Sequence, residues 1–164
     1  EPAVKLIIFD ALGDRAFCSG GDIAELYETG TRCDYAYGQT FWADEYRLNY
    51  KIFNYSKPII SFLQGFTMGG GVGIGCHGSH RIVGDSSQIA MPECGIGLIP
   101  DVGGSFMLAL SPGRLGEYLG VTAARMNASD AIFAGFADKY ISESKWPQLI
   151  EQLEISGDAD QLTQ

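Results

Sequence analysis

Two carboxylates with uncharged neighbours are the residues of this sequence best suited to chemistry. Glu93 and Asp101 each follow a proline, and both lie between Gly65 and Gly104, a stretch with seven glycines in its first fourteen residues. Glycine has no side chain, so the backbone at such positions can approach a ligand or another backbone segment closely. A carboxylate beside a loop of this kind is a candidate general base, general acid or nucleophile.

Two glycine-rich turns could supply backbone hydrogen-bond donors to the same site. They are Ser19-Gly20-Gly21 and Met68-Gly69-Gly70-Gly71, and each is predicted to follow a strand and open a helix. Two backbone N–H groups that converge on one oxygen form an oxyanion hole, which contributes about 3 kcal/mol per donor. Together with the carboxylates, the turns predict acyl transfer or enolate chemistry. The alternative is that the glycines serve packing and that Asp101 caps a helix beginning at Val102.

A third acidic residue, Glu45, lies on the apolar side of a predicted helix over residues 35–54. Four apolar residues share that stripe by their spacing, and they are Phe41, Leu48, Ile52 and Tyr55. A carboxylate on a buried helix face is costly unless it is paired or functional. A salt bridge to Arg47 or Lys51 and a role in a site are both consistent with the pattern.

Other kinds of site have weaker support in the sequence. The segment Gly73–Gly78 fits the GxGxxG pattern of dinucleotide-binding folds, but the preceding predicted strand ends about eight residues before Gly73. Close helix packing is therefore the favoured interpretation. The two histidines, His77 and His80, lack a third residue at a metal-ligand spacing, and the sequence has no GxSxG nucleophile motif. We therefore predict no metal site and assign both histidines to packing or the surface.

Composition excludes several classes of protein. The 164 residues are 46% hydrophobic and 19% charged, which is typical of one globular domain with a core. A net charge of −9 opposes a nucleic-acid partner, which requires a basic face. No apolar run approaches the roughly 20 residues of a membrane span, so no membrane partner is expected. The four cysteines form no CxxC pair and are expected to be reduced, which favours a cytoplasmic location, or the mitochondrial matrix in a eukaryote.

Alternating strands and helices must position these residues, which places the chain in the α/β class. The expected strands cover residues 4–10, 59–64, 80–84, 88–91 and 137–142. The expected helices cover residues 23–27, 35–54, a short segment up to 78, 102–110, 114–120, 128–134 and 146–155. Because the first residues run directly into a strand pattern and the last are polar, we expect a piece of a longer protein.

As an ordered set, five motifs resemble the enoyl-CoA hydratase/isomerase (crotonase) superfamily. They are Ala16-Phe17-Cys18-Ser19-Gly20-Gly21-Asp22-Ile23, Lys57-Pro58, Gly65-x-x-Met68-Gly69-Gly70-Gly71-Val72-Gly73, Ala90-Met91-Pro92-Glu93 and Gly97-Leu98-Ile99-Pro100-Asp101-Val102-Gly103-Gly104. The resemblance implies a spiral of β-β-α units with short helices packed on the sheets. It also implies a crotonase-like core over residues 1–142, incomplete at its N-terminus, and the start of a C-terminal helical region over residues 143–164.

Within the superfamily, the chain resembles the 3-hydroxyisobutyryl-CoA hydrolase branch. Hydratases carry a glutamate three residues after the middle glycine of the GGG turn, where this sequence has Gly73, while their other glutamate matches Glu93. After the proline of the Ile-Pro-x-x-Gly-Gly segment, hydratases usually have a small residue and hydrolases have aspartate, here Asp101. The segment Asp44–Asn49 matches a hydrolase-type helix whose second acidic residue corresponds to Glu45.

The resemblance implies a role for each candidate. The thioester carbonyl would lie between the amides of Gly21 and Gly70. Glu93 would activate water or attack through a transient anhydride, Asp101 would orient the water or the substrate hydroxyl, and Glu45 would hold that hydroxyl or tune the acids. The part of the site that binds coenzyme A would be formed by Arg15, Ala16, Phe17, Ser19 and Asp22, with Arg15 near the phosphates. No cofactor would be needed, because coenzyme A is part of the substrate.

Three functions stay open at this point. The first is hydrolysis of 3-hydroxyisobutyryl-CoA or a similar 3-hydroxyacyl-CoA in valine catabolism. The second is a hydratase or isomerase reaction of the same superfamily, and the third is an inactive acyl-CoA-binding or assembly fragment. The resemblance also implies self-association, as a homotrimer or hexamer.

Overall fold

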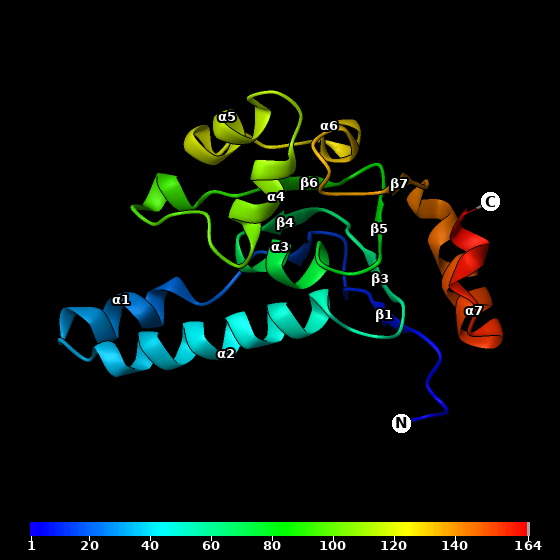
Figure 1. Cartoon of the computed structure of the whole chain (residues 1–164), viewed down its shortest axis with the longest axis horizontal. Helices are drawn as coiled ribbons and strands as arrows, with labels where there is room; N and C mark the ends of the chain where they lie inside the picture. Colours follow the sequence, from blue (N-terminus) through cyan, green and yellow to red (C-terminus); the bar gives the residue numbers. More distant parts are fainter. Residues whose placement is uncertain (164) are drawn as a thin grey trace.

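The structure, a computed structural model that describes residues 1–163, contains two parallel β-sheets surrounded by helices (Figure 1). The larger sheet has the order β1-β3-β5-β7, with strands Ile7–Phe9, Ile59–Phe62, His80–Val83 and Lys139–Tyr140. The smaller sheet has the order β2-β4-β6, with strands Ala16–Cys18, Phe66–Met68 and Gln88–Ala90.

The chain winds as a spiral in which strands of the two sheets alternate. Each of β1, β3 and β5 is followed by a strand of the smaller sheet and then by one or more helices, before the chain returns to the larger sheet. The expected α/β class and the β-β-α spiral are confirmed. The sequence analysis missed β2 and β4, which have three residues each, too few to show an alternating pattern.

The helices match the sequence-based expectation in number and order. They are α1 Ile23–Thr31, α2 Tyr35–Phe53, α3 Gly70–Gly75, α4 Gly104–Leu110, α5 Leu115–Thr122, α6 Ala128–Phe133 and α7 Trp146–Ser156. Three 3-10 turns accompany them, namely η1 Glu93–Ile96, η2 Glu143–Lys145 and η3 Ala159–Thr163. Among residues 1–163, none of these helices is long and apolar enough to cross a membrane.

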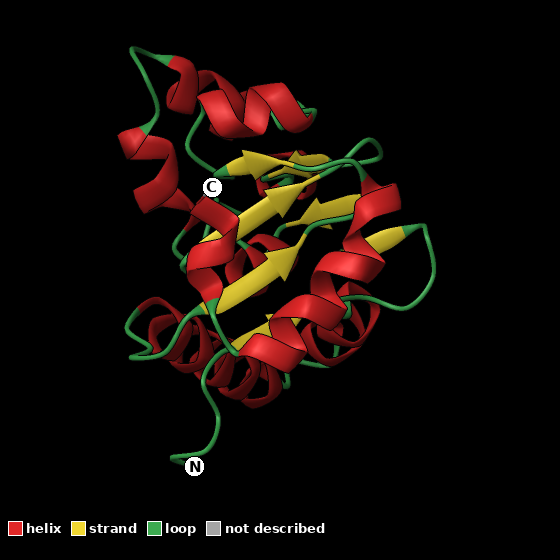
Figure 2. Cartoon of the chain, turned by 90° about the vertical axis from the view of Figure 1, so that its right-hand side faces the viewer, coloured by secondary structure: helices red, strands yellow, loops and turns green. Residues whose placement is uncertain are grey.

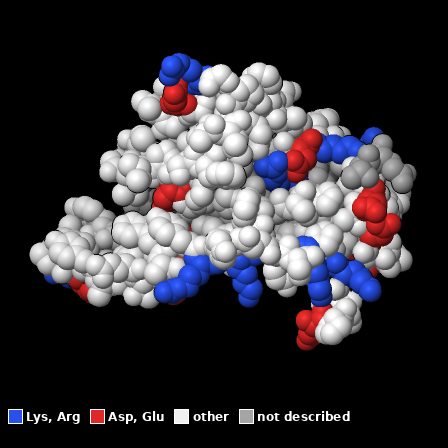
Figure 3. Space-filling view, viewed as in Figure 1, with Lys and Arg blue, Asp and Glu red and all other residues white. Residues whose placement is uncertain are grey.

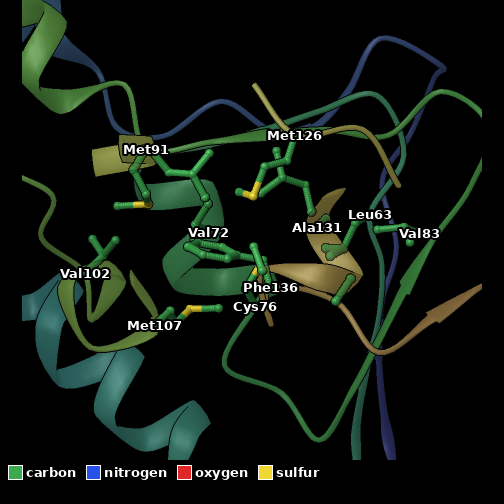
Figure 4. Packing of buried hydrophobic residues seen from close by; sticks show 14 residues of the cluster. Leu63, Val72, Cys76, Val83, Met91, Val102, Met107, Met126, Ala131 and Phe136 are labelled. Carbon is green, nitrogen blue, oxygen red and sulfur yellow. The ribbon is translucent and has the colours of Figure 1, made fainter. Parts of the chain in front are cut away.

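Helix α3 lies in the main core, against side chains from both sheets (Figure 4). Its Val72 packs in a cluster with Leu63, which directly follows β3, with Val83 of the larger sheet and with Ile89 of the smaller. A Cβ atom at Gly75 would lie 2.6 Å from the Leu63 side chain. The GxGxxG segment therefore serves close packing, as the sequence favoured.

A second core covers the other face of the larger sheet. Ile60, Phe62 and Ile82 pack with Trp146 and Leu153 of α7, and the ring centroids of Phe62 and Trp146 lie 5.2 Å apart. Figure 2, viewed from this side, shows helices in front of the strands. Val83, which follows Ile82 in β5, packs in the first core on the opposite face, as the pleat requires. The segment after residue 142 thus packs on the sheet, while the domain boundary proposed there stays a prediction.

The buried face of α2 differs from the predicted stripe. Ile52 is buried as expected, but Leu48 is 46% exposed and Tyr55 is 39% exposed, while the polar residue Asn49 is only 5% exposed. Gly38 and Asn49 are buried in α2, and Gly38 packs near Leu26 of α1. Because α2 packs between α1 and α3 through these small or polar residues, apolar spacing gave the wrong rotation about the helix axis.

Candidate active site

Three strands of the smaller sheet end at one edge and position the candidate site. Since β2, β4 and β6 are parallel, their carboxyl ends meet at the same edge of the sheet. Strand β2 is followed by Ser19-Gly20-Gly21, β4 by Gly69-Gly70, and β6 by Met91-Pro92-Glu93. The two predicted glycine turns and the first predicted carboxylate are therefore neighbours in space.

The two glycine turns are in direct contact. A Cβ atom built on Gly70 would lie 3.5 Å from the amide nitrogen of Gly21, and one on Gly20 would lie 3.2 Å from the amide nitrogen of Gly70. The register between β2 and β4 shifts between Ala16 and Cys18, a bulge of the kind that re-aims backbone next to functional sites. Gly70 is the first residue of α3, where a backbone N–H has no partner within its own helix.

All five residues predicted for catalysis and for the oxyanion hole line one narrow cavity of about 80 Å³. They are Glu45, Glu93, Asp101, Gly21 and Gly70. Its other walls include Ile23, Leu26, Phe41 and Trp42, so the acids lie among apolar side chains. In Figure 3, acidic atoms show in a hollow above the α1–α2 pair, within an otherwise largely uncharged region of this face.

Glu93 is the most buried acid of this cavity. It is 5% exposed, and its Oε2 atom has no hydrogen-bond partner among residues 1–163. Burial, together with the nearby charges of Asp101 and Glu45, raises the pKa of Glu93 to about 7, although a backbone hydrogen bond acts in the opposite direction. A carboxyl group with this pKa exchanges a proton near neutral pH, which suits a general acid or base.

Glu45 reaches the cavity from α2, with its Oε1 atom beside the α-carbon of Gly70. The alternative of a salt bridge to Arg47 or Lys51 is wrong: among residues 1–163 Glu45 forms no ion pair, and Arg47 instead pairs with Asp44 at 2.7 Å. Burial, followed by the charge of Asp101, raises the pKa of Glu45. The functional interpretation of this carboxylate is therefore the one that agrees with its surroundings.

Asp101 does not cap a helix, so the capping alternative is wrong. Helix α4 begins at Gly104 with Gly103 at the N-cap position. The Asp101 carboxylate instead accepts a hydrogen bond of 2.6 Å from the Tyr46 hydroxyl. Burial and this hydrogen bond raise the pKa of Tyr46. Tyr46 was not among the predicted site residues, although it follows Glu45 directly in the segment that resembles the hydrolase helix.

The residues predicted to bind coenzyme A have different surroundings. Ser19 lines the narrow cavity, and Asp22 caps α1 by accepting a hydrogen bond of 2.9 Å from the Ala24 amide. Arg15 is exposed, whereas Phe17 packs against the core cluster. Ala16 lies in β2 opposite Phe66. A role in coenzyme A binding stays a prediction for all five.

A larger cavity of about 600 Å³ adjoins the narrow one, and Asp101 lines both. It lies between the second half of α2 and residues 99–106. Its walls include the apolar residues Phe53, Pro100, Val102 and Phe106, and the polar residues Tyr46 and Asn49. Both polar atoms of the Asn49 side chain are buried without a hydrogen-bond partner among residues 1–163.

The histidines lie outside the narrow cavity. His77 lines the larger one, where its Nε2 atom is 2.6 Å from the carbonyl oxygen of Val102, and its ring meets Phe53 edge to face. His80 contacts Ser79. In the part of the chain that the structure describes, no group of three or more His, Cys, Asp and Glu side chains is placed to hold a metal ion.

Comparison with known proteins places these features in one family. The family model described as enoyl-CoA hydratase/isomerase matches residues 1–164. The 3-hydroxyisobutyryl-CoA hydrolase of Xenopus tropicalis mitochondria is 42% identical over 153 residues, which are 93% of this chain and 40% of that protein. The small ribosomal subunit protein mS47 of Neurospora crassa is 39% identical over 151 residues, 91% of this chain and 30% of that protein.

Solved structures share the same fold. A crystal structure described as an enoyl-CoA hydratase from Rhodobacter sphaeroides is 60% identical and superposes with a TM-score of 0.94, covering 96% of this chain and 47% of that one. This chain spans less than half the length of each of these three relatives.

Proposed function

The chain belongs to the enoyl-CoA hydratase/isomerase family, and we propose that the protein hydrolyses the thioester of 3-hydroxyisobutyryl-CoA or a similar 3-hydroxyacyl-CoA. Curated relatives at about 40% identity, in animals and in Arabidopsis thaliana, are named 3-hydroxyisobutyryl-CoA hydrolase. The site supports a hydrolase because it offers a buried carboxylate beside paired glycine amides.

The single observation that favours hydrolysis over hydration is the surroundings of Gly73. A Cβ atom at this position would lie 2.7 Å from Nδ2 of Asn49 and 2.8 Å from the Cβ of Val102. A glutamate, which hydratases carry at the matching place, therefore has no room in this packing. The site keeps one carboxylate of the hydratase pair, Glu93, and has Asp101 and Glu45 in addition.

The proposed reaction begins with the thioester carbonyl oxygen between the amides of Gly21 and Gly70. Glu93, ionised, takes a proton from a water molecule as the water oxygen bonds to the carbonyl carbon. The carbonyl oxygen becomes an oxyanion, which the two amides stabilise by about 3 kcal/mol each. Collapse of this intermediate breaks the C–S bond and releases the free acid and coenzyme A, whose thiolate takes up the proton.

Direct attack by Glu93 is the second route to the same products. Its carboxylate would displace the coenzyme A thiolate and form a mixed anhydride, which water then hydrolyses. Oxygen-18 in the solvent distinguishes the routes, because in a single turnover the anhydride route can leave a solvent oxygen on Glu93. In both routes, Asp101 and Glu45 orient the water or the hydroxyl group of the acyl chain.

The test is an assay of the full-length polypeptide that carries this sequence, with 3-hydroxyisobutyryl-CoA and a thiol reagent. Hydrolysis releases free coenzyme A, so thiol appears in proportion to the acid formed. A hydratase instead converts an enoyl-CoA such as methacrylyl-CoA to its hydroxylated product without releasing thiol. Hydration without thiol release would reject the hydrolase proposal in favour of the hydratase, the activity named for the Rhodobacter sphaeroides structure.

A non-catalytic role is the second candidate, because the Neurospora crassa relative is named as a ribosomal protein. Binding of acyl-CoA with neither thiol release nor hydration would favour it. For the active protein, we propose an acyl-CoA substrate, self-association as a homotrimer or hexamer, and a place in the mitochondrial matrix or the cytoplasm. The animal relatives are named as mitochondrial proteins.

A further inference from the structure

Asn49 is a buried amide with no partner in the part of the chain that the structure describes. It is 5% exposed, and neither its oxygen nor its nitrogen forms a hydrogen bond among residues 1–163. A buried polar group left unpaired costs about 1–3 kcal/mol, so such groups are rare unless a ligand satisfies them. Asn49 is one of the residues that line the larger cavity, so a ligand in that cavity would lie next to it.

The position of Asn49 relates it to the proposed catalytic residues. It follows Glu45 by one helical turn on α2, and the two side chains face α3: Glu45 lies beside Gly70, and Asn49 lies beside Gly73. Asp101 lines the same cavity as Asn49 and also the narrow cavity with Glu93. A ligand group that extends past Asp101 from the narrow cavity therefore enters the cavity that Asn49 lines.

The chemistry of an amide differs from that of the acids around it. An ionised carboxylate only accepts hydrogen bonds, whereas the asparagine side chain donates through its nitrogen and accepts through its oxygen. An alcohol also does both: its O–H group can donate to the amide oxygen, and its oxygen can accept from the amide nitrogen. The apolar residues Phe53, Val102 and Phe106 in the same cavity suit the hydrocarbon part of an acyl chain.

We propose that the Asn49 amide binds the hydroxyl group of the acyl chain and thereby selects hydroxylated acyl-CoA thioesters over their non-hydroxylated counterparts. The inference rests on the proposed function, since it names the part of the substrate that this residue contacts. A site built to hydrogen-bond a hydroxyl group rejects the analogue that lacks it, because the protein amide is then left buried and unpaired.

The experiment compares 3-hydroxyisobutyryl-CoA with isobutyryl-CoA, in the full-length polypeptide that carries this sequence. For Asn49→Leu, which keeps the size of the side chain and removes both polar atoms, kcat/KM for the hydroxylated substrate should fall at least 30-fold, on the order expected for one lost substrate hydrogen bond. The value for isobutyryl-CoA should change less than about 3-fold. The selectivity ratio should therefore fall about 10-fold or more.

Ser61→Ala is the matched control, because Ser61 is a second buried polar residue whose side chain has no partner among the described residues. It lies in β3, outside the residues that line either cavity. Its substitution should leave the selectivity ratio unchanged. An Asn49→Asp variant should recover part of the selectivity, since it keeps an acceptor at the same place.

Two results would overturn the proposal. An equal loss of kcat/KM for both thioesters would show that Asn49 only supports the fold, and unchanged kcat/KM values for both would show that it does not contact the hydroxyl group. Calorimetric binding of the two thioesters to wild type and Asn49→Leu gives the same comparison without turnover. If wild type releases no thiol, the hydrolase proposal fails, while the binding ratio still decides the role of Asn49.

Discussion

The hydroxyl group of Tyr46 donates a hydrogen bond to the Asp101 carboxylate, 2.6 Å away, across 55 residues of sequence. It joins α2 to the loop before α4, the two segments that border the larger cavity. Because Asp101 cannot rotate without losing this bond, Tyr46 fixes the direction in which its second oxygen points. Tyr46 is thus a positioning residue for a proposed catalytic acid.

Removal of that hydroxyl group should lower activity without unfolding the protein. Tyr46→Phe deletes a hydrogen bond to a charged group, for which a loss of about 1.5–3 kcal/mol is typical, equivalent to about 10- to 100-fold in kcat. The KM should change less than kcat, because the coenzyme A contacts stay in place. A fall in the thermal midpoint that parallels the loss of activity would instead indicate a purely structural bond.

Replacement of Glu93 should abolish hydrolysis and leave binding intact. In Glu93→Gln the side chain keeps its shape but can no longer accept a proton, so thioesterase kcat should fall by about 10³-fold or more. Acyl-CoA affinity, measured by titration calorimetry, should stay within about 3-fold of wild type. Glu117→Gln, at an exposed carboxylate paired with Arg114, is the control and should keep full activity. Wild-type rates in Glu93→Gln would reject the role given to this residue.

The pH dependence of activity should report the raised pKa of Glu93. If this carboxylate acts as base or nucleophile, it must be ionised, so kcat/KM should rise with pH and level off above a pKa of about 7. Thioesters of the same acid with different thiol leaving groups should show the same pKa in kcat/KM, since this pKa belongs to the free enzyme. A profile that is already flat at pH 5 would contradict the assignment.

The same raised pKa predicts a loss of stability with rising pH. The folded protein holds a proton on Glu93 up to about pH 7, whereas the unfolded chain releases it near the ordinary value of 4.5. The contribution is therefore fully present below pH 4.5 and is lost as the pH rises through 7. Glu93→Gln should remove this dependence and be more stable than wild type at pH 8, by on the order of 2 kcal/mol. Urea unfolding at pH 5 and pH 8 measures the difference.

Three glycine-to-alanine variants should separate packing from catalysis. At Gly71 the new methyl group would collide with the backbone carbonyl oxygen of Cys18, so Gly71→Ala should unfold or lose several kcal/mol. At Gly70 it would meet the Glu45 carboxylate, which can move, so Gly70→Ala should fold but lose at least about 100-fold in kcat. At Gly95 nothing lies within 4 Å, and Gly95→Ala should resemble wild type. Equal stability and activity in all three would refute this packing.

The parts of the site that could be predicted are those with a local chemical signature. Two glycine turns followed by helices led to Gly21 and Gly70, carboxylates with uncharged neighbours led to Glu93 and Asp101, and an apolar helix stripe led to Glu45. The structure places all five around one cavity. Their proximity itself could not be derived from spacing. It depends on β2, β4 and β6 pairing in one sheet, and each of these strands has only three residues, too few to show how it pairs.

The parts that could not be predicted depend on tertiary packing. Apolar spacing on α2 suggested that Leu48 is buried, whereas Asn49 takes the buried place because Gly73 of α3 leaves room beside it. Tyr46 likewise has an ordinary local context, and only its partner 55 residues away gives it a role. Local sequence does not indicate that Asn49 lies beside Gly73 or that Tyr46 bonds to Asp101.

The register of the strands in the smaller sheet fixes the relative positions of the site residues at its edge. Phe66, Thr67 and Met68 pair one to one with Gln88, Ile89 and Ala90, so the distance from Gly70 to Glu93 is counted in residues from these pairs. Inserting one residue after Met68 would advance Gly70 by about 3.3 Å without removing any core side chain. Insertions or deletions between β4 and Gly70, or between β6 and Glu93, should therefore abolish activity even in variants that still fold.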